Sequence, residues 1–222
     1  LVGYTSVLAK SNFALYFTNS LVVTCGSLLL VLLFGAMAAW ALTEYRFRAN
    51  GWVALYLAIG IMVPIRLGSV SILKLMVSFD LVNTLTALVL VYTAMGLPLA
   101  IFILGEFIQQ IPREMRDAAR IDGASEYRIF WNVILPLIRP AVATVAVFTM
   151  VPIWNDLWFP LILAPGATTQ TVTLGVQQFI GQYVTDWNAV LAALSLAVAP
   201  ILVLYVIFSR SLVRGITAGA VK

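Results

Sequence analysis

The sequence predicts an all-α membrane protein. Of its 222 residues, 62% are hydrophobic and only 10% are charged, and the mean hydropathy is +1.02. An ordinary soluble domain carries about 25% charged residues, so a surface of this composition cannot face water. The apolar residues also fall into uncharged runs that are long enough to cross a hydrocarbon core of about 30 Å as helices.

These uncharged runs define five expected transmembrane helices. The first, residues 19–42, is long and strongly apolar. The second, residues 49–65, has about the minimum length for a crossing and ends near Pro64 and Arg66. The other three spans are expected at 83–105, 141–164 and 188–209.

Lys and Arg indicate the orientation, because cytoplasmic loops of membrane proteins carry an excess of basic residues. Ten of them fall in one set of alternate gaps and three in the other set, Lys10, Arg66 and Lys74. The gaps with ten are expected to be cytoplasmic. The predicted organisation is thus one transmembrane domain, 1–222, with a cytoplasmic loop at 106–140, an extracytoplasmic loop at 165–187 and a cytoplasmic tail at 210–222.

Five crossings with a cytoplasmic carboxyl end place Leu1 outside the cell. The first stretch lacks the basic region, short apolar core and cleavage site of a secretory signal. We therefore expect at least one further membrane-spanning helix before Leu1 in the native protein.

Catalytic chemistry has little support in the sequence. There is no His, the single Cys25 allows no internal disulfide, and neither a Walker A pattern nor a GxSxG motif is present. We expect no enzyme activity, no metal and no cofactor in this chain, so any process that consumes ATP must draw its energy from another polypeptide.

The most informative segment, residues 111–140, reads IPREMRDAARIDGASEYRIFWNVILPLIRP. Pro112 suits a first helical position and Gly123 suits the left-handed residue beyond a helix end, so residues 113–122 are expected to form a short helix. Ser125 can cap a second helix with Glu126 in its first turn. The pattern predicts a helix, a tight glycine turn and another helix.

The charges of the 106–140 loop favour a protein partner. Five acidic residues accompany five Arg, which disfavours a polybasic lipid-binding patch, and Ala118 and Ala119 leave a low surface that a partner can approach closely. From spacing alone, an amphipathic surface helix without a partner is an equal alternative.

The stretch DAARIDGA, followed by Phe130, Ile134, Leu135 and Pro136, resembles the EAA loop of ATP-binding-cassette (ABC) importer permeases. WNDLWFPL at 154–161 and RGITAGAVK at 214–222 resemble the carbohydrate-uptake branch, specifically the smaller, second permease of maltose-type sugar transporters. The resemblance covers essentially the whole chain and implies the type I ABC importer transmembrane fold, whose members have six spans.

The resemblance also implies partners. The EAA loop would form a coupling helix that docks on a cytoplasmic ATPase, and the implied assembly is this chain, a homologous second permease, two copies of the ATPase that bind ATP and Mg, and an extracytoplasmic substrate-binding protein, in the bacterial inner membrane and without nucleic acid. The tail would insert between the ATPase subunits. The expected coupling residues are Glu114, Asp117, Ala118, Ala119, Asp122, Gly123 and Ala124.

One position departs from the family pattern, since Asp117 stands where the family has Glu. Its carboxylate reaches about one methylene less far, so a salt bridge to an ATPase Arg would be displaced or remade by Glu114. The resemblance supports the docking role more firmly than this particular contact.

Candidate substrate-path residues lie in the fourth expected span: Trp154, Asn155, Asp156 and Trp158. A carboxylate at membrane depth is costly and should face the bundle interior, a partner or water. Aromatic faces beside amide and carboxylate groups suit sugar recognition. The structural alternative is an aromatic belt with polar residues that tie helices together.

The polar segment at 165–187 contains no Lys or Arg, and Thr169, Gln170, Thr171, Gln177 and Gln178 are its candidate contacts. By resemblance, such a loop reaches into the external binding protein and helps to eject its ligand, and Gln and Thr suit competition with sugar hydroxyls. A solvated loop is the alternative.

The leading hypothesis is a permease that moves a sugar or related carbohydrate inward by alternating access, driven by partner ATPases. A polyol or a glycerol phosphate is an alternative substrate. An ion-driven secondary transporter would predict paired intramembrane acids and an inverted repeat, which the sequence lacks, and a noncatalytic scaffold would give the coupling loop no purpose.

Overall fold

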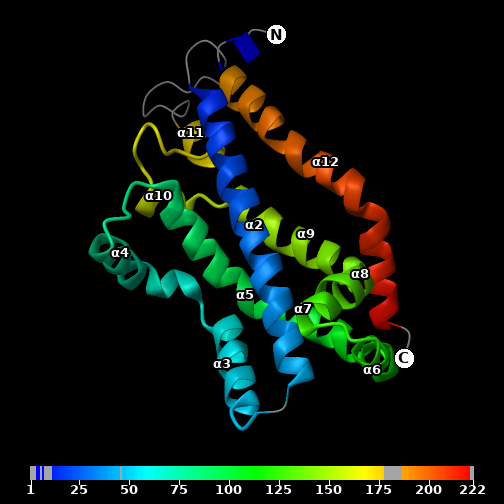
Figure 1. The fold of residues 1–222 in the computed structure, drawn as a ribbon. Helices are drawn as coiled ribbons and strands as arrows, with labels where there is room; N and C mark the ends of the chain where they lie inside the picture. The colour runs from blue at the N-terminus through cyan, green and yellow to red at the C-terminus, as the bar shows by residue number, and fades with distance from the viewer. Residues whose placement is uncertain (1–3, 6, 8–11, 46, 178–186, 221–222) are drawn as a thin grey trace. The chain divides into compact units, whose positions relative to one another are not determined.

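The structure is a computed structural model that describes residues 4–5, 7, 12–45, 47–177 and 187–220, with side chains described as far as Val203 (Figure 1). Within these residues the regular elements are all helical. Their bounds are α2 Phe13–Glu44, α3 Asn50–Met62, η1 Ile65–Gly68, α4 Ser69–Ser78, α5 Leu85–Gln109, α6 Arg113–Ile121, α7 Glu126–Ile129, the π-helical η2 Phe130–Ile134, α8 Leu135–Leu137, α9 Arg139–Asn155, α10 Trp158–Leu163, α11 Val172–Val176 and α12 Trp187–Ala220.

The first and third expected spans correspond to long apolar helices. Residues 19–42 lie within α2, and 83–105 largely coincides with α5. Among the described residues, these two helices are long and apolar enough to cross a membrane individually, and two further pairs of helices qualify only if each sharply bent pair is one span. The crossings themselves stay predictions.

The second and fourth expected spans are not single straight helices. α3 ends at Met62 because Val63, the residue before Pro64, adopts an extended conformation. Its 13 residues reach only about 20 Å, which is less than a hydrocarbon core of about 30 Å. In the fourth span, α9 ends at Asn155, and α10 begins a new helix at Trp158.

The last expected span, 188–209, lies within α12. The structure continues α12 beyond this span, into the expected tail, as far as Ala220. Val221 and Lys222 lie outside the described residues.

The chain divides into two compact units. The first unit comprises residues 1–27, 65–92 and 150–207, and the second comprises 28–64, 93–149 and 208–222. In the first unit, one buried cluster gathers around Leu88 and Leu163 and another around Tyr16 and Val190. The second unit has one buried cluster that joins α2, α5, α7 and α9 through Trp40, Leu104, Ile129 and Val145, among others.

Within the second unit, α2 and α5 pack closely at Gly35. A Cβ atom added there would lie only 2.9 Å from the Cβ of Ala100. Small residues at such a crossing let two apolar helices bring their backbones together without a hydrophobic driving force. This crossing fixes the end of α2 that approaches the charged loop.

Candidate functional site

The charged loop of the second unit forms the predicted helix, glycine turn and helix. α6 spans Arg113–Ile121, with Pro112 just before it and Asp122 just after it. Gly123 has a φ of +77°, the left-handed conformation that a side chain disfavours. The Ser125 hydroxyl accepts a hydrogen bond from the Arg128 amide at 3.4 Å and caps α7. These local predictions are confirmed.

One face of α6 is anchored by a buried arginine. Arg116 is only 4% exposed, and its Nη1 donates to Oε2 of Glu44, the last residue of α2, at 2.5 Å. Its Nη2 donates to the Ile111 carbonyl at 3.4 Å, and its guanidinium lies 5.7 Å from the Trp40 ring centroid. Removal of one partner from a buried ion pair of this kind strongly destabilises a protein, because the remaining charge is buried without compensation.

Arg120 extends the anchor to the other charges of the loop. It also pairs with Glu44, and it donates to Glu126 at 2.9 Å and to Asp117 at 3.1 Å. The Arg120 hydrogen bond lowers the pKa of Glu126, while its bonds to Glu126 and Glu44 raise the pKa of Arg120 itself. Burial, and then a hydrogen bond with Glu126, raise the pKa of Tyr45. These ion pairs and hydrogen bonds of Arg120 hold α6 and α7 to the end of α2.

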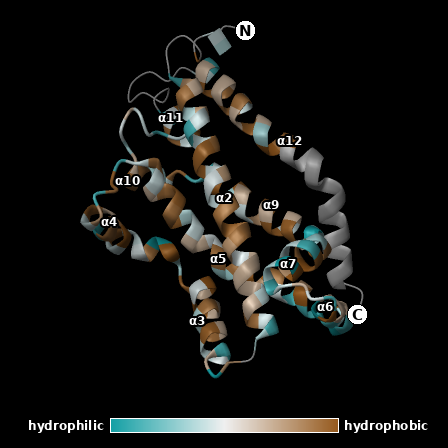
Figure 2. Cartoon of the chain, in the orientation of Figure 1, coloured by the Kyte–Doolittle hydropathy of each residue, from teal (hydrophilic) through white to brown (hydrophobic). Residues whose placement is uncertain are grey.

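The opposite face of α6 is open. Figure 2 shows the hydrophilic residues that gather on this helix. Two large apolar side chains of α6 interrupt the charges and are exposed, Ile121 at 87% and Met115 at 45%, and Tyr127 on α7 is 74% exposed. Exposed apolar groups among charges are typical of a protein docking surface.

The expected coupling residues divide between the two faces. Glu114, Asp117, Ala118, Asp122 and Gly123 are exposed. In contrast, Ala119 and Ala124 are half-buried and pack on the core of the second unit. The Asp117 carboxylate is bound by Arg120 of the same helix, although 61% of its side chain is exposed.

Sequence reasoning missed the role of Glu44, Arg116 and Arg120. Arg116 and Arg120 are four residues apart, so they share one helix face, and Glu44 is the charge that ends the long uncharged run of α2. Both signals are visible in the sequence. Their pairing is not, because it joins residues more than 70 positions apart.

In the first unit, Asp156 is engaged by the chain itself. Its Oδ2 accepts from the Tyr92 hydroxyl at 2.8 Å and from the Phe159 amide at 3.1 Å. Its Oδ1 accepts from the Trp158 amide at 3.2 Å and lies 3.8 Å from an Arg66 nitrogen. The carboxylate thus caps the first turn of α10, which explains why the helix breaks here.

The neighbouring candidate residues also form hydrogen bonds within the first unit. The indole nitrogen of Trp154, a residue only 2% exposed, donates to the Ala197 carbonyl at 2.9 Å. Trp158 donates to the Ser69 hydroxyl at 2.8 Å, and the Asn155 amide donates to the Val151 carbonyl at 2.8 Å. These contacts favour the helix-tying alternative, and the substrate-path role stays a prediction.

The segment after α10 folds against its own unit. Thr169 donates to Oδ1 of Asn83 at 2.9 Å, and Asn19 donates to the Gln170 carbonyl at 2.9 Å. Thr171 is buried and shares a hydrogen bond of 3.1 Å with Thr173. Gln177 is exposed. The remaining candidate, Gln178, lies outside the described residues.

The fold has the class of a transporter transmembrane domain. The chain is similar to a solved bacterial ABC transporter that imports the acidic polysaccharide alginate, with a TM-score of 0.81 and 20% identity. The likeness covers 94% of this chain and 78% of that one. The predicted fold class, an all-α type I ABC importer domain, is confirmed.

The chain belongs to the family described as the binding-protein-dependent transport system inner membrane component, which matches residues 4–218. It is 35% identical to a putative ABC transporter permease protein of Caldicellulosiruptor sp. (strain Rt8B.4), covering 100% of this chain and 80% of the relative. It is 34% identical to the probable starch degradation products transport system permease protein AmyC of Thermoanaerobacterium thermosulfurigenes, covering 100% and 81%. The predicted family is confirmed, and it is a family of membrane permeases rather than enzymes.

The anchor predicts a thermodynamic coupling between Glu44 and Arg116. Glu44→Gln should lower the stability of the purified protein by about 3–5 kcal/mol, because it leaves the buried charge of Arg116 without an ion-pair partner. Arg116→Met should cost less, because Arg120 still pairs with Glu44. The double variant should lose less than the sum of the two, by about 1–3 kcal/mol. Thermal denaturation in detergent measures this, and Arg128→Met at an exposed position serves as the control. Strict additivity would contradict the contact.

A second prediction separates the two roles of Asp156. Asp156→Asn should lower the free energy of unfolding by about 1–3 kcal/mol, because one acceptor of the cap becomes a donor. Asp80→Asn, at an exposed carboxylate, should leave stability unchanged. If Asp156→Asn instead keeps full stability and raises only the KM for uptake, Asp156 contacts substrate and does not act as a cap.

Proposed function

We propose that this chain is a permease subunit of a binding-protein-dependent ABC importer for a carbohydrate, located in the bacterial inner membrane. Membership of the family supports the transport class. The carbohydrate class is supported by the names of similar proteins, one for starch degradation products and one for alginate. The proposal includes a homologous second permease, two cytoplasmic ATPases and an extracytoplasmic substrate-binding protein.

The observation that carries the proposal is the two-faced character of α6. One face is fixed to α2 through Glu44, and the other exposes Met115, Ala118 and Ile121. A helix held rigidly from behind and open in front is suited to receive force from a docked partner. The partner ATPases would supply ATP hydrolysis, with Mg, outside this chain.

The mechanism then follows from the anchor. Closure of the ATPase pair would move α6, and the Glu44 contacts would carry that displacement into α2 because the buried ion pairs resist separation. Asp117 would offer its exposed oxygen to the ATPase only while Arg120 holds its rotamer. Alternating access results when helices of the transmembrane domain follow the end of α2.

The candidate contact residues of the extracytoplasmic segment differ in their exposure. Thr169, Gln170 and Thr171 would shape the segment through the contacts they make within the first unit. Gln177 would present its amide outward, and with Gln178 it is the part of the segment proposed to meet the binding protein. Sugar hydroxyls can both donate to and accept from such amides.

Substitution at Gly123 tests the coupling role. Gly123→Val should abolish substrate-stimulated ATP hydrolysis and uptake in proteoliposomes, because a β-branched residue is strained at a φ of +77° and would reorient α6. Gly123→Asn should retain most activity, since Asn tolerates the left-handed conformation. Both variants must purify with the membrane complex.

Two outcomes would contradict this role. Unchanged uptake and ATPase stimulation in Gly123→Val would show that the geometry of the turn is irrelevant to transport. A wild-type chain that never co-purifies with an ATPase would remove the importer assignment itself.

A further inference from the structure

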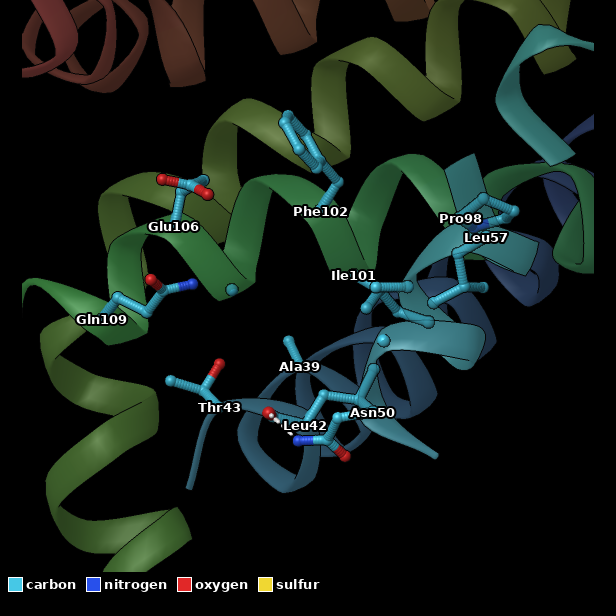
Figure 3. Close-up of a pocket in the computed structure, with 13 residues that line it drawn as sticks. Ala39, Leu42, Thr43, Asn50, Leu57, Pro98, Ile101, Phe102, Glu106 and Gln109 are labelled. Carbon is cyan, nitrogen blue, oxygen red and sulfur yellow. Dashed lines mark hydrogen bonds between the residues drawn. The ribbon is translucent and has the colours of Figure 1, made fainter. Parts of the chain in front are cut away.

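A cleft of about 420 Å³ lies in the second unit, bounded by α2, α3 and α5 (Figure 3). Asn50, Ala54 and Leu57 line it from one face of α3, and Pro98, Ile101 and Gly105 are among the α5 residues opposite. A second cavity of about 360 Å³ adjoins it, with Leu42, Thr43, Asn50 and Gln109 shared, and adds Arg113 and Arg116. The volume of each of these two cavities lies in the range of ligand pockets.

α3 lies close to α5 near Gly60, whereas the space beside Gly51 is open. A Cβ atom added at Gly60 would lie 3.4 Å from Pro98 Cγ, whereas one added at Gly51 would have no neighbour within 4 Å. None of the residues of α3 is buried. The two helices therefore meet near Gly60 and leave an apolar space toward Asn50.

The lining changes from apolar to polar along the cleft. Figure 3 places Leu57 and Pro98 at one end and Glu106 and Gln109 at the other. The polar end continues into the cavity with Arg113 and Arg116, on the side of the chain that the basic residues predict to be cytoplasmic. An apolar cleft with a charged mouth is complementary to an amphiphilic molecule, which has an apolar chain and a polar headgroup.

Two buried polar atoms on lining residues lack a hydrogen-bond partner within the described part of the chain, Asn50 Oδ1 and Arg116 Nε. The Asn50 amide nitrogen donates to the carbonyls of Leu42 and Tyr45, so the unpaired oxygen is fixed as an acceptor. Both atoms are enclosed by protein, so neither is open to a ligand in the cleft. Contact with a ligand at the mouth is therefore left to the exposed charged side chains.

The mouth carries one exposed charge of each sign. Arg113 and Glu106 are exposed, and neither forms an ion pair with any residue that the structure describes. A ligand that carries both an anion and a proton-bearing cation would complement them. An anionic glycerol headgroup would offer Glu106 only neutral hydroxyl donors, which bind a carboxylate more weakly than an ammonium does, and a quaternary ammonium has no N–H to donate.

We propose that this cleft binds one glycerophospholipid of the phosphatidylethanolamine class. An acyl chain lies between α2, α3 and α5, the phosphate meets Arg113, and the ammonium donates to Glu106. Charge-assisted bonds of this kind are the strong ones. The lipid would fill the wedge beside the helix that carries Glu44.

Native mass spectrometry of the full transporter complex in mild detergent tests the site. The complex is titrated with palmitoyl-oleoyl lipids that carry ethanolamine, choline or glycerol headgroups. One ethanolamine lipid should be retained, with about tenfold preference over choline, the effect of one charge-assisted hydrogen bond. Glu106→Gln should move the preference toward the glycerol lipid.

Matched variants on α3 locate the bound molecule. Ala54→Phe fills the cleft and should reduce retention of the ethanolamine lipid about tenfold, whereas Ala58→Phe, exposed on the same helix but outside the lining, should not. Equal retention of all three lipids, preference for the glycerol lipid in the wild type, or equal effects of the two Phe variants would overturn the proposal. So would a complex that retains no lipid because the second permease covers the cleft.

Discussion

The Glu44 carboxylate is the contact on which the proposed coupling surface depends. It lies at the end of a 32-residue apolar helix and is shared by Arg116 and Arg120 of α6. Opposite charges removed from water attract strongly, but they stabilise a structure only when each is paired. This constraint fixes the orientation of α6, and it leaves the Ile121 side of the helix open to a partner.

Polar residues elsewhere follow the same rule of satisfaction. Asp156 would be costly in an apolar setting, and four groups of its own unit surround it. The indole N–H groups of Trp154 and Trp158 likewise donate hydrogen bonds to partners within the chain. The polar groups that stay open lie instead on α6, around Gln177 and at the mouth of the α2–α3–α5 cleft, and these are the surfaces to which the chemistry assigns ligands.

Local patterns accounted for much of the architecture. The long uncharged runs predicted α2 and α5, and Pro112, Gly123 and Ser125 predicted the helix and turn of the charged loop, because propensity and capping act within a few residues. The break at Asp156 was missed, since the partners of this carboxylate include the distant Tyr92. The Glu44 anchor was missed for the same reason. The continuation of α12 to Ala220 was not predicted, because glycines in this segment are typical of a non-helical tail.

Distances between spin labels test the central claim most directly. Labels at Met37→Cys on α2 and Ile121→Cys on α6, both exposed positions of the second unit, are placed in a Cys25→Ser background of the complete transporter. If Glu44 joins the two helices into one moving body, the distance distribution should keep its mean and width between the nucleotide-free and the ATP-trapped states. A shifted or broadened distribution on ATP binding would show that α6 moves independently of α2 and would contradict the account.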